Sequence, residues 1–180
     1  MQINPVLKTL NHNKGYSNME NINELIIPAA RLGELDVINE LIKRGVDLNH
    51  RDDKGYTPLI IACYNNQPEA AKILIDAGAA IDAADFGGNT ALMGASFKGY
   101  LPIAKLLVEN GASLNLQHGN GGTALMFAAM FGRNEVLRLL LEHGADPTIV
   151  DHTGKRAVEL AAIQGNEVGI EMLQAHIEDT

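Results

Sequence analysis

Cysteine, aromatic residues and long apolar runs are scarce in this sequence of 180 residues. The single cysteine, Cys63, rules out an intramolecular disulfide and leaves no set of thiolates for a metal site. Aromatic residues make up only 4% of the chain and tryptophan is absent, so the position of each aromatic side chain is informative. The stretch 1–21 contains neither an apolar run of secretory length nor a membrane span, and we therefore expect a cytoplasmic protein.

Positive charge is also in short supply. The chain has 14 Lys and Arg against 22 Asp and Glu, which gives a formal net charge of -8 and a pI near 5.1. Proteins that bind nucleic acid or anionic membranes usually present a basic surface that neutralises phosphate groups. In the most basic stretch, residues 31–54, acidic residues are interleaved with the basic ones, so the charges largely cancel. We expect no nucleic-acid or membrane partner, and a basic or neutral protein surface is the better candidate.

Threonines, glycines and pairs of small residues recur at intervals of 33 residues. The threonine triplet appears as Thr57-Pro58-Leu59, Thr90-Ala91-Leu92 and Thr123-Ala124-Leu125, and more weakly as Arg156-Ala157-Val158. One glycine series is Gly45, Gly78, Gly111 and Gly144, and another is Gly33, Gly99, Gly132 and Gly165, with Asn66 at the missing position. No insertion interrupts this register over five units, which predicts an array in which each unit packs against the next.

Each unit has the features of two short helices joined by tight turns. Threonine followed by Pro or Ala is typical of a helix N-cap, because its hydroxyl accepts a hydrogen bond from a free backbone N–H. Small pairs such as Ala95-Ser96 lie in mid-helix, where a neighbouring helix must approach closely. A second amphipathic segment follows, and a glycine that adopts the left-handed conformation ends it. The polar, glycine-rich segment before the next threonine predicts a projecting turn.

This pattern, with Thr-Pro-Leu and Gly144-Ala145-Asp146, resembles the ankyrin repeat over about residues 22–175. The resemblance implies an all-α solenoid of about five helix-turn-helix units with projecting β-turn or hairpin loops. We place the units at about 22–51, 52–84, 85–117, 118–150 and 151–175, after a polar extension (1–21) with a short capping helix over 5–11, and before a tail (176–180). Where the family usually has His after Thr-Pro-Leu, this chain has Ile60, Met93 and Met126, which replaces a hydrogen bond between turns with apolar packing.

The sequence contains no arrangement that predicts catalysis, a cofactor or a bound metal. None of the six histidines is spaced to pair with another on a helix, and we interpret His118 and His152, in neighbouring turns, as solvent-exposed turn residues. Cys63 occupies a position otherwise filled by Ala or Ser, so we expect a buried, unreactive thiol. Aspartates that recur at one turn position, with His118 replacing them once, are interpreted as structural caps of the turn: Asp52, Asp85 and Asp151.

The resemblance implies that a partner docks on a concave face, lined in this family by the first helix of each unit and the projecting turns. The positions concerned are the two residues after each small pair and the tips of the turns. Aromatic side chains and Met are enriched where partners bind. The predicted binding residues are Leu32, Tyr56, Tyr64, Asn65, Phe86, Asn89, Phe97, Lys98, Met130, Phe131 and Ile163. The alternative is that these side chains pack between adjacent first helices and only stiffen the stack.

We therefore expect a non-catalytic, monomeric module that binds another protein. The runs 88–95 and 123–129 resemble small stand-alone bacterial ankyrin proteins, which implies a chaperone-like, protective or inhibitory accessory of one partner, such as a catalase or a toxic hydrolase. A second hypothesis within the binding class is an effector directed at a eukaryotic host. Outside that class stand an enzyme or small-molecule receptor, which would need a deep polar pocket, and a purely structural spacer.

Overall fold

The computed structural model describes residues 19–178, and this part of the chain forms ten helices in five pairs. The first helices of the pairs are α2 (Met19–Leu32), α4 (Pro58–Tyr64), α6 (Ala91–Lys98), α8 (Ala124–Met130) and α10 (Ala157–Ile163). The second helices are α3 (Leu35–Lys43), α5 (Pro68–Asp76), α7 (Leu101–Glu109), α9 (Asn134–Glu142) and α11 (Glu167–Glu178). In the described part, extended pairing is confined to one isolated antiparallel bridge, between Ala84 and Thr90. The predicted all-α solenoid of helix-turn-helix units is confirmed.

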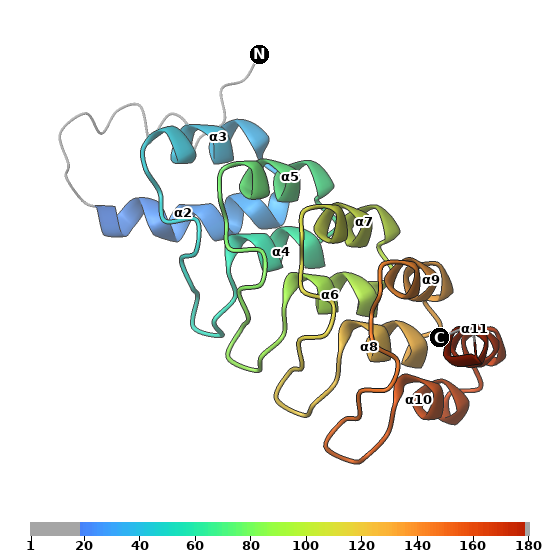
Figure 1. Ribbon diagram of the computed structural model, residues 1–180. Coiled ribbons are helices and arrows are strands. Elements are labelled where there is room, and N and C mark those ends of the chain that lie inside the picture. The colour runs from blue at the N-terminus through green and yellow to red at the C-terminus, as the bar shows by residue number, and fades with distance from the viewer. Residues whose placement is uncertain (1–18, 179–180) are drawn as a thin grey trace.

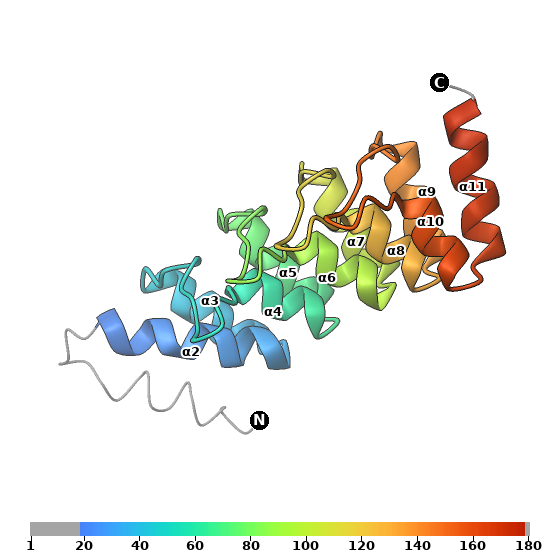
Figure 2. The same ribbon diagram turned by 90° about the horizontal axis from the view of Figure 1, so that it is seen from below.

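The pairs stack into two parallel rows of helices (Figure 1). Contacts run from α2 through α4, α6 and α8 to α10 in the inner row, and from α3 through α5, α7 and α9 to α11 in the outer row. The loops that join one pair to the next project from the inner row on the same side (Figure 1), and α2 and α11 stand at opposite ends of the stack (Figure 2). We call the surface formed by the inner row and the projecting loops the concave face.

The threonine of each repeat begins an inner helix because its hydroxyl replaces a missing backbone acceptor. The hydroxyls of Thr57, Thr90 and Thr123 accept hydrogen bonds from the backbone N–H three residues later, at 3.3, 3.4 and 3.3 Å. All three threonines are buried. At α10, where Arg156 holds this position, the Glu159 carboxylate instead accepts a bond from the Arg156 backbone N–H at 2.8 Å. The predicted threonine N-caps are confirmed.

The tight turn between the two helices of a pair needs a left-handed residue. Gly33, Gly99, Gly132 and Gly165 supply it, and Asn66 does so with φ of 55°. Asparagine tolerates this conformation better than most side chains, which explains why it replaces glycine there. The prediction that Asn66 takes the glycine position is confirmed.

The projecting loops are capped as the sequence predicts. Asp85 is typical: its Oδ1 accepts from the backbone N–H groups of Gly87 and Asn89, both at 2.8 Å. Asp52 and Asp151 make the equivalent pairs of bonds. His118 replaces them in the fourth unit, where its Nδ1 accepts from the Asn120 N–H at 2.8 Å.

Neighbouring loops are tied together through the backbone rather than through side chains of the Thr-Pro-Leu motif. The bonds run from Phe86 N–H to the Lys54 carbonyl at 3.1 Å, from Gly119 N–H to Gly87 at 2.8 Å, and from His152 N–H to Asn120 at 3.0 Å. The positions that follow the threonine triplet are buried apolar residues, as predicted: Ile60, Met93 and Met126. Backbone hydrogen bonds therefore join successive loops above a layer of buried apolar side chains, and side-chain bonds such as that from Gln117 to the Val150 carbonyl add to them.

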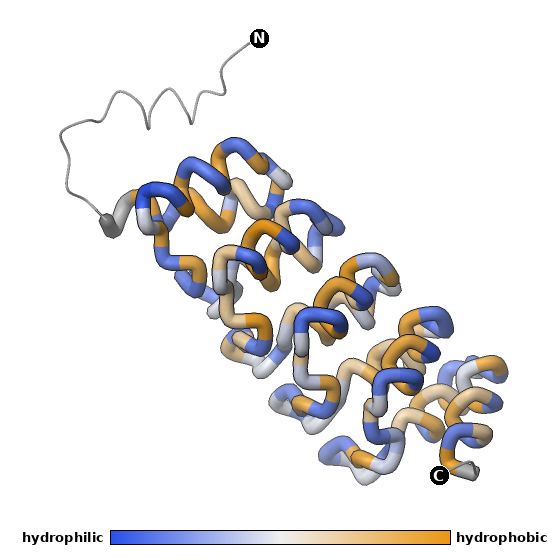
Figure 3. The backbone as a smooth tube through the Cα atoms, turned by 45° about the horizontal axis from the view of Figure 1, so that its top comes forward, coloured by the Kyte–Doolittle hydropathy of each residue, from blue (hydrophilic) through white to orange (hydrophobic). Residues whose placement is uncertain are grey.

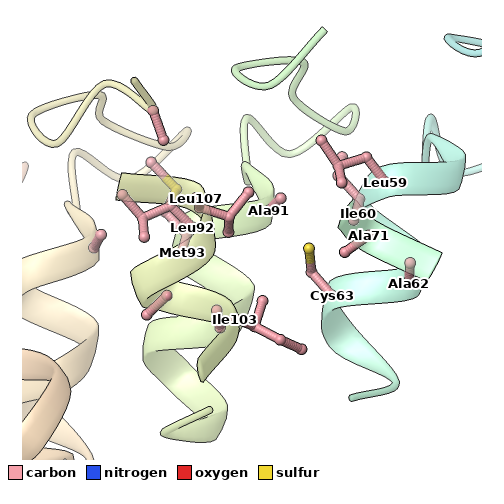
Figure 4. Packing of buried hydrophobic residues seen from close by; sticks show 14 of the residues in the cluster. Leu59, Ile60, Ala62, Cys63, Ala71, Ala91, Leu92, Met93, Ile103 and Leu107 are labelled. Atoms are coloured by element: carbon pink, nitrogen blue, oxygen red, sulfur yellow. The ribbon is translucent and has the colours of Figure 1, made fainter. Parts of the chain in front are cut away.

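The core runs the length of the stack between the two rows of helices. Polar and apolar residues alternate along the helices of the outer row (Figure 3), as expected where one side meets the inner row and the other faces water. Leu59, Leu92 and Leu107 are among the fully buried side chains, and they belong to a single cluster that includes Cys63 (Figure 4). The predicted burial of Cys63 is confirmed, and burial raises the pKa of its thiol to about 12, which favours the less reactive protonated form.

The two ends extend further than the sequence boundaries suggested. Helix α2 begins at Met19 rather than at residue 22, and α11 continues to Glu178 into the expected tail over 176–180. At the C-terminal end, Ile170 and Leu173 are three residues apart and lie on the face of α11 that packs against the core. Leu173 is fully buried there. The expected capping helix over 5–11 lies outside the described residues. Across residues 19–178, no helix combines the length and apolarity that a membrane crossing requires.

Candidate functional site

A row of aromatic side chains crosses the concave face from one repeat to the next. Tyr64 ends α4, Phe97 is in the last turn of α6, and Phe131 caps α8, so each takes a similar place in its own unit. The rings of Tyr64 and Phe97 are nearly parallel with centroids 6.5 Å apart, and Phe97 meets Phe131 edge-on at 4.6 Å. Offset-parallel and edge-to-face pairs at these distances are favourable arrangements of aromatic rings. We call these three residues the aromatic row.

The aromatic row is partly packed and partly open. Tyr64 is 44% exposed and Phe131 is 40% exposed, while Phe97 lies half-buried between them. The Lys98 ammonium lies over the Tyr64 ring, 4.4 Å from its centroid, which is close enough for a cation–π contact. These side chains therefore contact each other between repeats and still offer ring surface to solvent; their role in binding stays a prediction.

A groove of about 340 Å³ opens beside the aromatic row, between the inner helices and the projecting loops. We call it the central groove. It is lined by Arg31, Tyr56, Ile60, Ile61, Tyr64, Asn65, Asp85, Asn89, Thr90, Met93, Gly94, Phe97 and Phe127. These residues come from α2, α4, α6, α8 and two projecting loops, so the groove exists only when four repeats are stacked. Five of the predicted binding residues line it: Tyr56, Tyr64, Asn65, Asn89 and Phe97.

The remaining predicted residues are spread along the concave face. Leu32 and Ile163 are 65% and 61% exposed at the ends of α2 and α10, and neither lines the central groove. Phe86 is 73% exposed near a loop tip, directly against Gly55 of the preceding loop. Met130 is half-buried and faces a second hollow in the C-terminal half of the array. The structure therefore gathers five predicted residues in the central groove, and it brings Lys98 and Phe131 into contact with Tyr64 and Phe97 beside it. Four predicted residues lie apart from this group: Leu32, Phe86, Met130 and Ile163.

The second hollow brings together the two histidines that the sequence places in neighbouring turns. His118 and His152 both line it, beside Asp151 and Met130. The His118 ring packs against Phe127 at a centroid distance of 5.1 Å, and its Nδ1 is engaged as the cap of its own turn. Within residues 19–178, no three His, Cys, Asp or Glu side chains are grouped so that they could hold a metal ion. The structural role of His118 accounts for its position.

Several lining residues were not selected from the sequence. Arg31, Gly94 and Phe127 are the main ones; Asp85 was assigned only its turn-capping role. Gly94 lies three residues before Phe97, and Phe127 three residues before Met130, so each shares a helix face with a residue that was selected. The i−3 spacing was the signal that could have identified Gly94 and Phe127, whereas Arg31 directly follows the small pair Ala29-Ala30, at the repeat position of Tyr64 and Phe97.

A family model described as ankyrin repeats (3 copies) matches residues 26–118 and residues 110–180. The two matches overlap and together cover well over half of the chain. The matched residues include all of α4, α6 and α8, and the part of α2 from residue 26 onward, which contains the groove residue Arg31.

Three curated relatives are similar over shorter stretches. Protein phosphatase 1 regulatory subunit 27 of Homo sapiens is 44% identical over 43 residues, which cover 24% of this chain and 28% of that protein. A Rickettsia felis protein whose name describes an ankyrin repeat protein is 35% identical over 49 residues, covering 27% of this chain and 74% of that protein. A palmitoyltransferase of Aspergillus oryzae is 36% identical over 73 residues, but these cover only 10% of the enzyme. The chain thus spans less than a third of the phosphatase subunit and a tenth of the palmitoyltransferase.

Proposed function

This chain belongs to the ankyrin-repeat family, and from that premise we propose that it is a non-catalytic module that binds a partner protein on its concave face. The observation that carries the proposal is the aromatic row, Tyr64, Phe97 and Phe131, which stays partly exposed beside an apolar groove. Aromatic side chains are enriched at interfaces because they bury a large area with few rotatable bonds. Their loss of solvent on binding supplies a driving force that a rigid spacer would not need.

The role we infer for the chain is that of an accessory, protective or inhibitory, to one partner. The similarity to a protein named as a regulatory subunit of a phosphatase supports binding as the mode of action, although it extends over only 43 residues. A single cysteine with a buried thiol suits a reducing compartment, and we propose that the monomer acts in the cytoplasm. An enzyme or receptor role has less support, because the central groove is open, shared between repeats and mainly apolar.

The test is a pull-down from an extract of cells that express the protein. Three baits are compared: the wild type, the triple variant Tyr64→Ser/Phe97→Ser/Phe131→Ser, and a control with Lys72→Ser, Lys105→Ser and Arg138→Ser. The control changes the same number of side chains at one repeat position of the outer row, where all three residues are exposed. Circular dichroism and thermal unfolding establish that all baits are folded.

We expect the wild type and the outer-row control to retain one partner that the concave-face triple variant loses. Since truncating an interface anchor typically costs about 2 kcal/mol or more, three such changes should remove the partner from a washed resin. Retention of the same partner by all three baits would contradict a concave-face interface and favour the spacer hypothesis.

A further inference from the structure

Gly94 lies inside helix α6, where glycine weakens a helix relative to alanine. The backbone does not require it, because Gly94 is not among the residues with positive φ. A Cβ built on Gly94 would meet only the Tyr64 Cδ2 atom at 3.6 Å, which is an ordinary van der Waals contact. At the same repeat position the neighbouring units have Ile61 and Phe127. Gly94 therefore leaves a gap between two large side chains without a steric reason in the fold.

This gap coincides with the central groove. Gly94, Ile61 and Phe127 all line the groove, and Tyr64 and Phe97 of the aromatic row form part of its wall. Its volume of about 340 Å³ is at the lower end of the range found for ligand sites in proteins. An apolar recess of this kind, next to aromatic rings and central in a surface, is where interface hot spots usually insert a single large side chain.

Two cations without an ion pair lie near this recess, one in the groove lining and one over a ring of its wall. Arg31 lines the groove from α2, and Lys98 reaches over the Tyr64 ring from α6. Within residues 19–178, neither side chain has an acidic partner within 4.0 Å. Asp85, which lines the groove from a loop, is already engaged: its carboxylate accepts bonds from Gly87 N–H and from the backbone and side chain of Asn89.

The charge at this edge is opposite to that of the molecule. The chain carries a formal net charge of -8, yet Arg31 in the groove lining and Lys98 over the ring of the wall residue Tyr64 outnumber the one lining carboxylate, Asp85. An acidic group placed near either cation would gain a favourable electrostatic contact, and partial desolvation by the aromatic rings would strengthen the attraction. A basic group would meet repulsion at the same point.

We propose that the recess at Gly94 receives one bulky apolar side chain of a partner protein segment, and that acidic residues beside it in that segment pair with Arg31 of α2 and with Lys98 of α6. This inference rests on the proposed function, to which it adds the chemistry of the partner. Gly94 is then a specificity-determining residue, because the missing side chain makes the recess. Arg31 and Lys98 select the acidic neighbour.

The experiment selects ligands from random linear peptides displayed on phage, with the wild-type chain as bait. Recovered peptides are then titrated against four proteins: wild type, Gly94→Leu, Arg31→Glu/Lys98→Glu, and Lys105→Leu. The last variant is a matched control that adds the same leucine to the exposed surface of α7 in the same repeat. If Gly94→Leu does not fold, Gly94→Met replaces it with a more adaptable side chain. The charge-reversal pair alters side chains that have no ion pair in the described part of the chain.

The proposal predicts peptides in which Leu, Phe or Met stands next to Asp or Glu. Gly94→Leu should weaken their binding by about tenfold or more, while Lys105→Leu leaves it unchanged. Selection against the charge-reversed protein should recover Lys or Arg in place of the acidic residue. Peptides that lose binding in the Tyr64→Ser/Phe97→Ser/Phe131→Ser variant but not in Gly94→Leu would overturn this inference and leave the concave-face function intact.

Three other outcomes also overturn the inference. Peptides without an acidic preference would show that Arg31 and Lys98 do not select the ligand. A library that yields no specific binder would show that the recess does not recognise a linear segment. Self-association of the wild type, detected by light scattering and abolished by Gly94→Leu, would mean that a second copy of the chain occupies the recess.

Discussion

At the scale of single residues, one of the small positions in the core carries a buried hydroxyl group. Ser96 occupies the position that Cys63 holds in the preceding unit and Ala129 in the next. Its hydroxyl is fully buried and, among the residues that the structure describes, has no hydrogen-bond partner. An unpaired buried hydroxyl loses its bonds to water without replacing them, so this position is a local weakness of the core.

We expect Ser96→Ala to raise the free energy of unfolding by roughly 1 kcal/mol, because alanine fills the helix without a stranded hydroxyl. Urea denaturation followed by circular dichroism measures the change. The reciprocal variant, Cys63→Ser, introduces a hydroxyl at the equivalent buried site and should be less stable than the wild type. Equal stability of Ser96→Ala and the wild type would mean that the Ser96 hydroxyl does find a partner in solution.

Carboxylates in the last two units make the stability depend on pH. A side-chain hydrogen bond from Thr148 lowers the pKa of Asp146 below its ordinary 3.8, a backbone bond from Lys155 does the same for Asp151, and a side-chain bond from Arg156 lowers the pKa of Glu159 below 4.5. Because each folded pKa lies below the unfolded value, the unfolded chain binds more protons between these values. The stabilisation is complete above the unfolded values and is lost as pH falls through the folded ones.

The urea midpoint should therefore stay nearly constant above about pH 5.5 and decrease as pH falls from about 5 towards 3. Asp151→Asn keeps an oxygen that can accept from the turn but cannot titrate, so its midpoint should depend less on pH in that range. An acid dependence identical to that of the wild type would show that the Asp151 turn does not contribute to it.

At the scale of helices and turns, the N-caps can be tested one at a time. Thr123 is buried, and its hydroxyl accepts from the Met126 N–H at 3.3 Å at the start of α8. Thr123→Ala should lower the free energy of unfolding by about 1 kcal/mol, since the donor at Met126 loses its acceptor. Thr123→Ser retains the hydroxyl and should lose less. Thermal or urea unfolding compares the two variants, and equal losses would assign the effect to the methyl group instead of the cap.

The helices and turns were the most predictable part of the structure, because their signals are local. The threonine that caps α6 and the left-handed Asn66 are each determined by a few neighbouring residues. The helix ends at the two extremes of the array were less predictable. Helix α2 begins at Met19 and α11 runs to Glu178, and within residues 19–178 no neighbouring unit lies beyond either helix to mark the boundary with a turn.

The central groove was only partly predictable, for a physical reason. Tyr64 and Phe97 could be selected because they share a repeat position, but the recess depends on what is missing at Gly94 between Ile61 and Phe127. A missing side chain forms a recess only between neighbouring helices, so the recess can be recognised only when the arrangement of those helices is known. The pairing state of Arg31 likewise depends on residues from other repeats.

At the scale of the whole molecule, the array behaves as a one-dimensional stack in which each unit is stabilised by its neighbours. Within the described part of the chain, α2 and α11 belong to the two end units, and each of these units contacts a neighbouring unit on one side only. We expect hydrogen exchange to be slowest in α6 to α9 and faster towards both ends. Mass spectrometry of deuterium uptake measures this gradient. Uniform protection along the chain would indicate a single cooperative block instead.

The central claim for the molecule as a whole is that a partner binds the concave face, and substitution of the aromatic row tests this claim most directly. The decisive measurement is the dissociation constant of the partner recovered by pull-down, determined by isothermal titration against the wild type and the Tyr64→Ser/Phe97→Ser/Phe131→Ser variant. We predict a loss of about 2 kcal/mol or more, which is roughly a 30-fold increase in Kd, with no change for the outer-row control. Equal dissociation constants for the wild type and the folded triple variant would contradict the claim.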